Sequence, residues 1–225
     1  MTQDQTADLT WKDGAIPVAT RFDDPYFSLE NGLAETRHVF LAGNDLPARF
    51  RPGFHVAELG FGTGLNMLAT LLAWQAADAP EGVQFTSFEA YPMAVEDVAR
   101  SLEAFPDARA VADPFLAAWA EGQRVFDVHG LRVEVIEGDA RDRLATWEGK
   151  ADAWFLDGFS PAKNPELWGE DLMKEVARHT APNGTFATYT AAGFVRRALD
   201  AGGFDVERVP GFGRKRHMSR GVLRP

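Results

Sequence analysis

Val56-Ala57-Glu58-Leu59-Gly60-Phe61-Gly62-Thr63-Gly64-Leu65-Asn66 is the stretch that decides the fold, because a short apolar run becomes three alternating glycines and then an amphipathic segment. This pattern predicts a strand, a tight loop and a helix. Glycine adopts backbone angles that other residues avoid and places no side chain against a ligand, so the loop suits a nucleotide-like group at a helix N-terminus. A dinucleotide fingerprint would need glycine at position 65, where this chain has leucine, and this mismatch weakens an NAD interpretation.

Strands alternate with helices along most of the remaining chain. Strands are expected over residues 56–59, 83–88, 123–128, 131–136, 153–156, 185–189, 205–209 and 217–223, and helices over 65–77, 94–104, 114–120, 165–179 and 194–201. This alternation predicts an α/β fold with a doubly wound, largely parallel sheet whose ligands gather at the carboxyl ends of the strands. Residues 1–50 form an N-terminal extension, with a hairpin expected over 9–20 and a helix over 33–42, and residues 51–225 form the main domain.

Composition narrows the classes of function. The 225 residues include 33 Asp and Glu against 23 Lys and Arg, so a net charge of -10 argues against nucleic-acid binding through an overall basic surface, although a local basic patch is allowed. The absence of cysteine excludes thiolate zinc sites and thiol nucleophiles. The five histidines lack ligand spacing, so we expect no metal. No apolar run approaches the roughly 20 residues of a membrane helix, and we expect a cytoplasmic protein.

Acidic residues stand where four of the expected strands end: Glu58, Glu89, Asp139 and Asp157. Glu89, at the end of the second strand, is placed to accept hydrogen bonds from ribose hydroxyls. Asp139 could accept the amine hydrogen of an adenine, or it could simply cap a helix. Together Glu58, Glu89 and Asp139 make the cleft anionic, which suits a cationic sulfonium better than a pyrophosphate.

Asp157 ends an apolar run that is typical of a strand buried on both faces. A protonated alkylamine has no lone pair, so it must lose a proton and be aimed before it can be alkylated. A carboxylate within hydrogen-bond reach can do both. Asp157 is therefore the candidate catalytic residue, and the competing interpretation is an ordinary turn or cap aspartate.

The combination of Glu58, the three glycines, the acidic end of the second strand and the Gly138-Asp139-Ala140 turn resembles class I S-adenosylmethionine-dependent methyltransferases. The resemblance implies a Rossmann-like, mostly parallel seven-stranded sheet and S-adenosyl-L-methionine as cofactor. The implied cofactor-binding residues are Glu58, Gly60, Gly62, Gly64, Asn66, Glu89, Asp139, Ala140 and Asp157.

A narrower resemblance covers roughly residues 9–224. The motifs that carry it are Tyr26-Phe27-Ser28, Asn31-Gly32-Leu33, Glu35-Thr36-Arg37, His38-Val39-Phe40-Leu41, Gly43-Asn44, Asp157-Gly158-Phe159-Ser160-Pro161, Lys163-Asn164-Pro165 and Gly213-Arg214-Lys215-Arg216. They are similar to the methyltransferase module of the MnmC family and its stand-alone form MnmD. The resemblance implies N-methylation of 5-aminomethyl-2-thiouridine at the tRNA wobble position, giving 5-methylaminomethyl-2-thiouridine. In that family an FAD-dependent oxidase is often fused to the module; this chain has no second dinucleotide motif, so the oxidase would be a fused or separate partner.

For the tRNA anticodon loop we expect substrate contacts from Tyr26, Phe27, Phe159, Ser160 and Lys163, with Trp168 as a further stacking candidate, because an exposed base stacks on aromatic side chains. Phosphate contacts are expected from Arg214 and Lys215, within a basic cluster that extends to Arg216 and Arg220, with Arg196 and Arg197. Two alternatives stay open. One is a methyltransferase for a small-molecule or protein amine, and the other is a non-catalytic nucleotide- or RNA-binding module, which the presence of Asp157 beside the loop disfavours.

Overall fold

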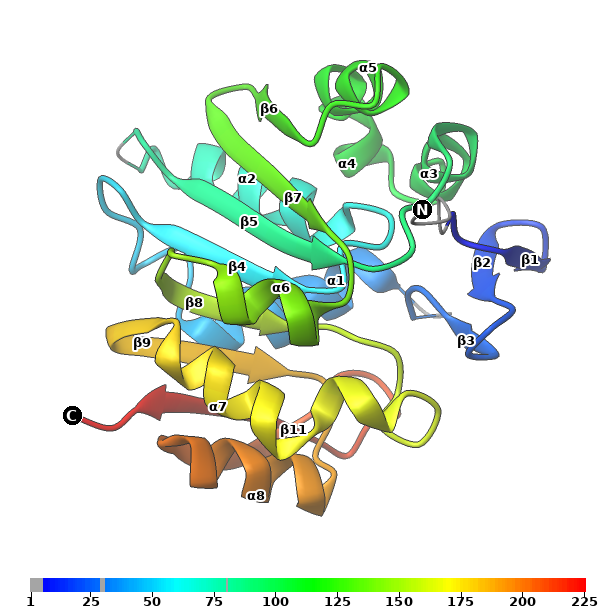
Figure 1. Cartoon of the computed structure of the whole chain (residues 1–225). Helices are drawn as coiled ribbons and strands as arrows, with labels where there is room; N and C mark the ends of the chain where they lie inside the picture. The colour runs from blue at the N-terminus through cyan, green and yellow to red at the C-terminus, as the bar shows by residue number, and fades with distance from the viewer. Residues whose placement is uncertain (1–5, 29–30, 80) are drawn as a thin grey trace.

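The structure, a computed structural model, describes residues 6–28, 31–79 and 81–225. In these residues eight strands form one sheet in the order β10-β11-β9-β8-β4-β5-β7-β6 (Figure 1). The five central strands from β9 to β7 run parallel, while β11, β10 and β6 extend the sheet by antiparallel pairing. The strands are β4 (His55–Leu59), β5 (Gln84–Glu89), β6 (Val125–Val128), β7 (Leu131–Glu137), β8 (Ala151–Leu156), β9 (Thr180–Thr188), β10 (Phe204–Pro210) and β11 (His217–Leu223).

The expected fold class is confirmed, and the sheet contains the eight strands that the sequence predicts, one more than the seven that the resemblance implies. The additional strand is β6, which pairs with β7 as a hairpin around His129 and Gly130, both with positive φ. Because β6 lies at the edge of the sheet, it lengthens the sheet without changing the order of the parallel strands.

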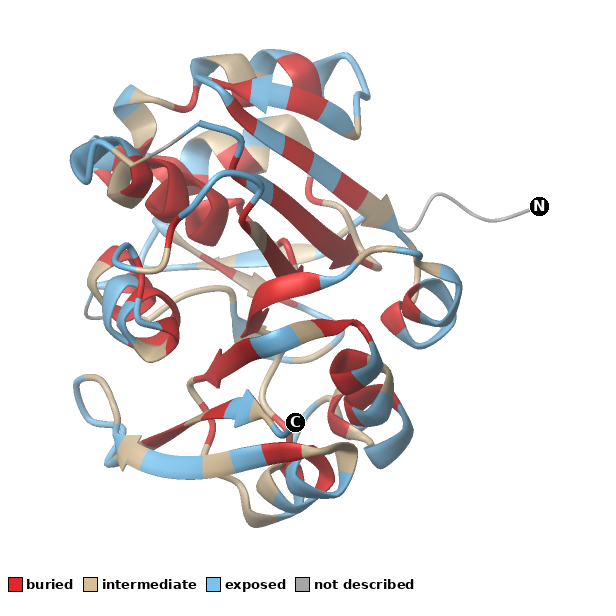
Figure 2. Cartoon of the chain, turned by 90° about the vertical axis from the view of Figure 1, so that its left-hand side faces the viewer, coloured by how far each residue is buried: buried red, intermediate tan, exposed pale blue. Residues whose placement is uncertain are grey.

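Helices cover both faces of the sheet and bury an apolar layer on each (Figures 1 and 2). One face carries α1 (Gly32–Thr36), α2 (Leu65–Ala76), α3 (Val95–Leu102), α4 (Pro106–Ala110) and α5 (Asp113–Ala120). The other carries α6 (Ala140–Thr146), α7 (Glu170–Arg178) and α8 (Gly193–Gly202). The central strands are therefore buried on both sides, and all six residues of β8 are buried.

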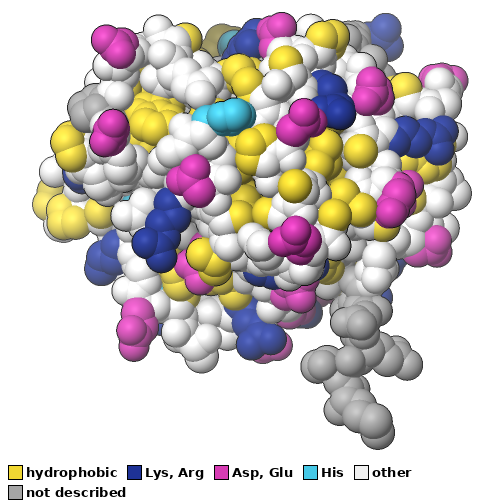
Figure 3. Space-filling model, turned by 90° about the horizontal axis from the view of Figure 1, so that it is seen from above, with side chains coloured by type: hydrophobic (Ala, Val, Ile, Leu, Met, Phe, Trp, Pro, Cys, Tyr) yellow, Lys and Arg dark blue, Asp and Glu magenta, His cyan; other side chains and the backbone are white. Residues whose placement is uncertain are grey.

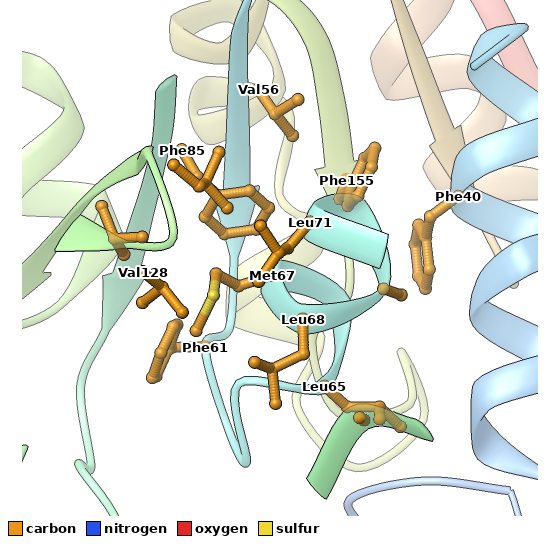
Figure 4. Packing of buried hydrophobic residues seen from close by; sticks show 14 of the residues in the cluster. Phe40, Val56, Phe61, Leu65, Met67, Leu68, Leu71, Phe85, Val128 and Phe155 are labelled. Atoms are coloured by element: carbon orange, nitrogen blue, oxygen red, sulfur yellow. The ribbon is translucent and has the colours of Figure 1, made fainter. Parts of the chain in front are cut away.

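Large side chains fill the first of these layers. Met67 and Leu71 of α2 point toward Phe85 of β5, and Phe40 stands beside Phe155 of β8 (Figure 4). The rings of Phe40 and Phe155 stack with their centroids 5.4 Å apart. Burial of a large apolar side chain stabilises a fold by about 1.5–3 kcal/mol, so these contacts fix both α2 and the segment of Phe40 against the sheet.

The N-terminal extension contains the expected hairpin, β1 (Leu9–Lys12) with β2 (Ile16–Ala19), and the short β3 (Asp24–Pro25) completes a small antiparallel sheet. Figure 1 shows this small sheet beyond the carboxyl ends of the central strands. The helix expected over residues 33–42 is divided into α1, a π-helical turn η1 (Arg37–Leu41) and a 3-10 turn η2 (Ala42–Asn44). The boundary at residue 50 stays a prediction.

Hydrogen bonds explain why the chain leaves η2 where it does. The buried amide of Asn44 donates to the carbonyls of Phe40 and Trp154, at 2.9 and 3.3 Å, so the turn is tied to β8. The helix expected over 165–179 is also divided, into η3 (Pro165–Trp168) and α7, because Gly169 takes an extended conformation. Within the described ranges no helix is long and apolar enough to span a membrane.

Candidate functional site

A cavity of about 800 Å³ opens at the carboxyl ends of β4, β5, β8 and β9, under the segment that carries β3. Among the residues expected at the site, the structure brings to this cavity Tyr26, Phe27, Gly60, Gly62, Asn66, Glu89, Asp139, Ala140, Asp157, Phe159, Ser160, Lys163, Arg214 and Lys215. Glu58 and Gly64 lie outside its lining. One site thus gathers residues that are as far apart in the chain as Tyr26 and Lys215.

The glycine loop joins β4 to α2, as the sequence predicts, and all three glycines have positive φ. A Cβ at Gly60 would lie 2.3 Å from the carbonyl oxygen of Asp157, so glycine lets the ends of β4 and β8 approach closely. A Cβ at Gly62 would meet the ring of Tyr26 at 3.0 Å. A Cβ at Gly64 would meet the ring of Phe115 at 2.9 Å, so glycine is required there for packing, and its part in cofactor binding stays a prediction.

Asn66 is the centre of a buried hydrogen-bond network at the start of α2. Its Nδ2 donates to Glu58 Oε1 at 2.8 Å and to Asp157 Oδ2 at 2.7 Å, and its Oδ1 accepts from Thr36 Oγ1 at 2.7 Å. Both amide hydrogens are therefore used within the protein. Asn66 lines the cavity and positions Asp157, and its expected contact with the cofactor stays a prediction.

Glu58 lies behind the cavity wall and is fully buried. Its second oxygen accepts from Ser87 Oγ at 2.7 Å. Burial raises the pKa of Glu58 well above its ordinary value, and the hydrogen bonds from Ser87 and Asn66 oppose this shift. Glu58 lies outside the cavity lining and is linked to it through Asn66, so its expected part in cofactor binding stays a prediction.

Asp157 directly follows β8 and lies against the glycine loop. Burial raises the pKa of its carboxyl to about 7; the hydrogen bond from Asn66 opposes the shift, the nearby Glu35 carboxylate adds to it and the Lys215 ammonium opposes it. A carboxyl that titrates near neutral pH can both accept and release a proton under physiological conditions. The geometry therefore suits the proton-accepting role that the sequence suggests.

Glu89 ends β5, and the backbone N–H groups of Gly62 and Tyr91 donate to its two oxygens at 2.9 and 2.7 Å. Burial raises the pKa of Glu89, and these backbone hydrogen bonds oppose the shift. Each oxygen keeps a lone pair for a further donor. With a side-chain-free loop beside it, this carboxylate fits a ribose diol, and the other lining carboxylates fit a sulfonium.

Asp139 is the N-cap of α6 and accepts from the backbone N–H of Arg141 at 2.9 Å. The Arg141 guanidinium also pairs with its carboxylate, and this hydrogen bond lowers the pKa of Asp139. Both interpretations of Asp139 are therefore compatible with the geometry, because a capping carboxylate at the cavity still offers an oxygen to a ligand. Arg141 also lines the cavity, and sequence reasoning missed it.

An aromatic wall closes one side of the cavity. The ring of Phe159 stacks on Phe22 at 4.6 Å and meets Tyr26 edge-on at 5.1 Å. Phe27 packs edge-on against Phe105 at 4.9 Å. Trp168 is buried and donates its indole N–H to the Phe159 carbonyl at 2.9 Å, so it supports Phe159 and is not available to stack on a base.

Two polar contacts fasten the Asp157 loop to the N-terminal extension. The backbone N–H of Ser160 donates to Asp24 Oδ2 at 2.7 Å, and the Lys163 ammonium pairs with the Asp23 carboxylate at 2.9 Å. The extension thus forms part of the cavity wall. Lys163 lines the cavity and is paired with Asp23 in this arrangement, and its expected contact with the substrate stays a prediction.

Lys215 lies differently from the expected phosphate contact. Its ammonium is 2.8 Å from Glu35 Oε1 and 4.1 Å from the ring centroid of Tyr189. The Tyr189 hydroxyl donates to the Gly158 carbonyl at 2.8 Å. Sequence reasoning did not assign roles to Glu35 or Tyr189; Tyr189 follows β9, so the rule of strand ends that identified Asp157 would have identified it too.

Comparison with known proteins agrees with this geometry. A family model described as S-adenosyl-L-methionine-dependent methyltransferase matches residues 104–224. The chain belongs to this methyltransferase family. The cofactor class expected from the glycine loop and its acidic surroundings is thereby confirmed.

Relatives of this methyltransferase confirm the narrower resemblance. The chain is 44% identical to the tRNA 5-methylaminomethyl-2-thiouridine biosynthesis bifunctional protein MnmC of Caulobacter sp. (strain K31), over 99% of the chain and 39% of that protein. It is 43% identical to the protein of the same name from Stutzerimonas stutzeri (strain A1501), over 97% of the chain and 35% of that protein. The chain thus spans little more than a third of the length of these curated relatives.

A solved structure shows the same fold over almost the whole chain. The crystal structure of MNMC2 from Aquifex aeolicus matches with a TM-score of 0.75 and 25% identity, covering 99% of this methyltransferase and 72% of that chain. The match includes the N-terminal extension, because it covers nearly every residue.

Proposed function

We propose that this chain transfers a methyl group from S-adenosyl-L-methionine to the exocyclic primary amine of 5-aminomethyl-2-thiouridine at the wobble position of tRNA. The observation that carries the proposal is the Asp157 carboxylate, which lines the cavity beside the glycine loop and is fixed by Asn66 at 2.7 Å. The similarity to proteins named for 5-methylaminomethyl-2-thiouridine biosynthesis supports this substrate.

The chemistry follows from the states of the amine and the carboxyl group. The substrate enters as an ammonium ion and gives one proton to Asp157, whose pKa of about 7 suits it to accept. The freed lone pair forms the new N–C bond. Bound S-adenosyl-L-methionine supplies the methyl carbon, whose bond to sulfur breaks as the new bond forms. The product is a secondary ammonium ion, and Asp157 returns its proton to solvent.

Other residues of the site would bind the cofactor and the substrate base. Glu89 and the backbone of the glycine loop would hold the ribose, and Asp139 or Ala140 would face the adenine. Phe159 and Tyr26, whose rings meet at the cavity wall, would hold the exposed base. The proposal also implies a cytoplasmic reaction and an FAD-dependent oxidase, fused or separate, that produces the primary amine.

The test is to incubate the protein with labelled S-adenosyl-L-methionine and tRNA that carries the aminomethyl intermediate, and then to analyse the nucleosides. We expect label in 5-methylaminomethyl-2-thiouridine. Transfer to a small or protein amine without transfer to this tRNA would instead favour the alternative substrate class. Binding of the cofactor without transfer to any amine would favour a non-catalytic module.

A further inference from the structure

The Lys215 ammonium is held in the way that proteins hold a ligand cation. It lies 2.8 Å from Glu35 Oε1 and 4.1 Å from the face of the Tyr189 ring. Glu35 is 9% exposed, and both partners line the cavity that contains Asp157. A buried carboxylate beside an aromatic face binds alkylammonium groups through charge and through the ring quadrupole.

The Lys215 ammonium, which lies between Glu35 and Tyr189, resembles chemically the aminomethyl group that is the proposed methyl acceptor. A lysine side chain ends in a methylene and a primary ammonium with three N–H donors, and an aminomethyl group ends in the same two groups. The position of Lys215 is also coupled to the reacting centre, because its ammonium opposes the raised pKa of Asp157 while the Glu35 carboxylate adds to it. All three side chains therefore share one electrostatic environment.

We infer that Glu35 and Tyr189 form the subsite for the substrate ammonium, and that Lys215 occupies it as an internal substitute until the amine displaces it. This inference rests on the proposed function and adds to it two residues that bind the amine. Glu35 would hold the charged amine while the neighbouring Asp157 takes its proton. Two carboxylates with separate tasks are needed, because the group that holds the cation must stay ionised while the other is protonated.

When Lys215 is displaced from Glu35, its ammonium can pair with phosphates of the tRNA. Lys215 is 47% exposed, and it lies in the loop between β10 and β11, flanked by Arg214 and Arg216. A tRNA substrate brings phosphates to this loop, so the ammonium exchanges one anionic partner for another. A free amine offers no such partner. Lys215 would therefore select tRNA over small amines, since only tRNA compensates for the lost contact with Glu35.

The experiment compares Lys215→Met with Lys174→Met. Lys174 is a matched control because its ammonium pairs with Glu170 at 2.9 Å and its side chain is 51% exposed, but it lies on α7 outside the cavity lining. The probes are the 5-aminomethyl-2-thiouridine nucleoside, its 5-hydroxymethyl analogue and unmodified tRNA, and the readout is the equilibrium dissociation constant by calorimetry.

For Lys215→Met we expect the aminomethyl nucleoside to bind about 5-fold to 30-fold more tightly, because the nucleoside no longer competes with an ion pair and a cation–π contact. The hydroxymethyl analogue should gain nothing, and unmodified tRNA should bind more weakly. Lys215→Arg keeps a cation in the subsite and should keep the weak nucleoside binding. Lys174→Met should match the wild type with all three probes.

Unchanged or weaker binding of the aminomethyl nucleoside by Lys215→Met would overturn the inference, and so would an equal gain for the hydroxymethyl analogue. Binding of n-propylamine, a bare primary ammonium, separates this result from a failure of the proposed function. If the wild type does not methylate aminomethyl-tRNA but Lys215→Met gains affinity for n-propylamine, the subsite stands and only the identity of the substrate falls. If neither amine binds more tightly, the subsite falls whatever the wild type methylates.

Discussion

The raised pKa of Asp157 suits the residue to accept a proton, but it also makes the folded protein less stable at neutral pH. In the unfolded chain its carboxyl ionises at its ordinary pKa of 3.8, whereas burial raises this pKa to about 7 in the folded protein. Between these values the folded protein binds more protons than the unfolded chain. The contribution of Asp157 to stability is therefore complete below about pH 4 and is lost as the pH rises through about 7.

Asp157→Asn removes this titration while keeping an oxygen that can accept from Asn66. We expect the variant to gain about 1–3 kcal/mol in free energy of unfolding over the wild type at pH 8, and little at pH 4.5, after allowing for water that enters the cavity. Urea unfolding of both proteins without cofactor, at the two pH values, measures the difference. A gain that is equal at both pH values would contradict the raised pKa.

The same substitution separates proton acceptance from binding. An asparagine cannot take the proton from the substrate ammonium, so we expect kcat to fall by about 100-fold or more. The affinity for S-adenosyl-L-methionine should change far less, because Glu89 and the glycine loop remain in place. Single-turnover transfer to aminomethyl-tRNA and calorimetry with the cofactor check the two halves. Full activity would end the proposed role of Asp157.

For Glu89 we expect a loss of cofactor affinity, in contrast to the loss of kcat expected for Asp157→Asn. Its oxygens accept from the backbone N–H groups of Gly62 and Tyr91, and they would also accept from the ribose. Glu89→Gln removes the charge and turns an N–H group toward one of these donors. We expect cofactor affinity to weaken by about 1.5–3 kcal/mol, the usual value of hydrogen bonds to a charged group. Unchanged affinity by calorimetry would remove Glu89 from the ribose site.

At the scale of elements, the unit of β4, glycine loop and α2 holds the site together. Gly60 has a φ of +92°, and a Cβ there would lie 2.3 Å from the Asp157 carbonyl oxygen. Gly53 is a matched control, because its φ is +73° and nothing lies within 4 Å of an added Cβ. Both substitutions to alanine incur the strain of positive φ, but only Gly60→Ala pushes β4 away from β8.

We therefore expect Gly60→Ala to lower the free energy of unfolding by about 2–4 kcal/mol, and Gly53→Ala by about 1 kcal/mol. Cofactor affinity should fall only in the first variant. Chemical denaturation and calorimetry provide the measurements. Equal losses of stability in the two variants would show that backbone strain alone, and not the close approach of the two strands, determines the effect.

Helices and strands whose apolar residues recur at regular spacing could be predicted from the sequence. Elements whose conformation depends on tertiary contacts could not. The apolar spacing of α2 predicts its bounds to within one residue, Leu65–Ala76 against 65–77. The π-helical turn at Arg37–Leu41 carries no such signal, because Asn44 and Phe40 fix it through contacts with β8. For the same reason the strand-end rule found Asp157 but not Glu35, which comes from a helix.

At the scale of the whole molecule, charge is separated along the chain. Residues 193–225 contain eight Lys and Arg and three Asp and Glu, whereas the preceding 192 residues contain 15 and 30. This basic segment forms α8, β10 and β11, at the end of the sheet opposite β6. On the face shown in Figure 3, acidic and basic side chains are instead interspersed. Arg109 of α4, for example, pairs with Asp113 at the start of α5 at 2.6 Å.

Three arginines, Arg208, Arg216 and Arg196, lie near His217 at the start of β11, and burial together with their guanidinium groups lowers the pKa of this histidine. An anionic backbone is the partner that such a surface attracts, even on a chain with a net charge of -10. Within the basic cluster expected to contact phosphates, Arg220 already pairs with Glu207 at 3.0 Å, so it is a poor choice for testing phosphate contact. Arg208 and Arg216 are the better test.

We expect the double variant Arg208→Glu and Arg216→Glu to weaken tRNA binding and to lower the slope of log affinity against log salt by about 2, one for each phosphate contact. Methylation of the aminomethyl nucleoside should be unaffected, since neither residue lines the cavity. Arg132→Glu, on the exposed face of β7 in the other half of the sheet, is the control. If Arg132→Glu weakens tRNA binding as much as each of the two substitutions at Arg208 and Arg216, then the net charge of the protein governs association. In that case the basic end of the sheet is not the tRNA-binding surface.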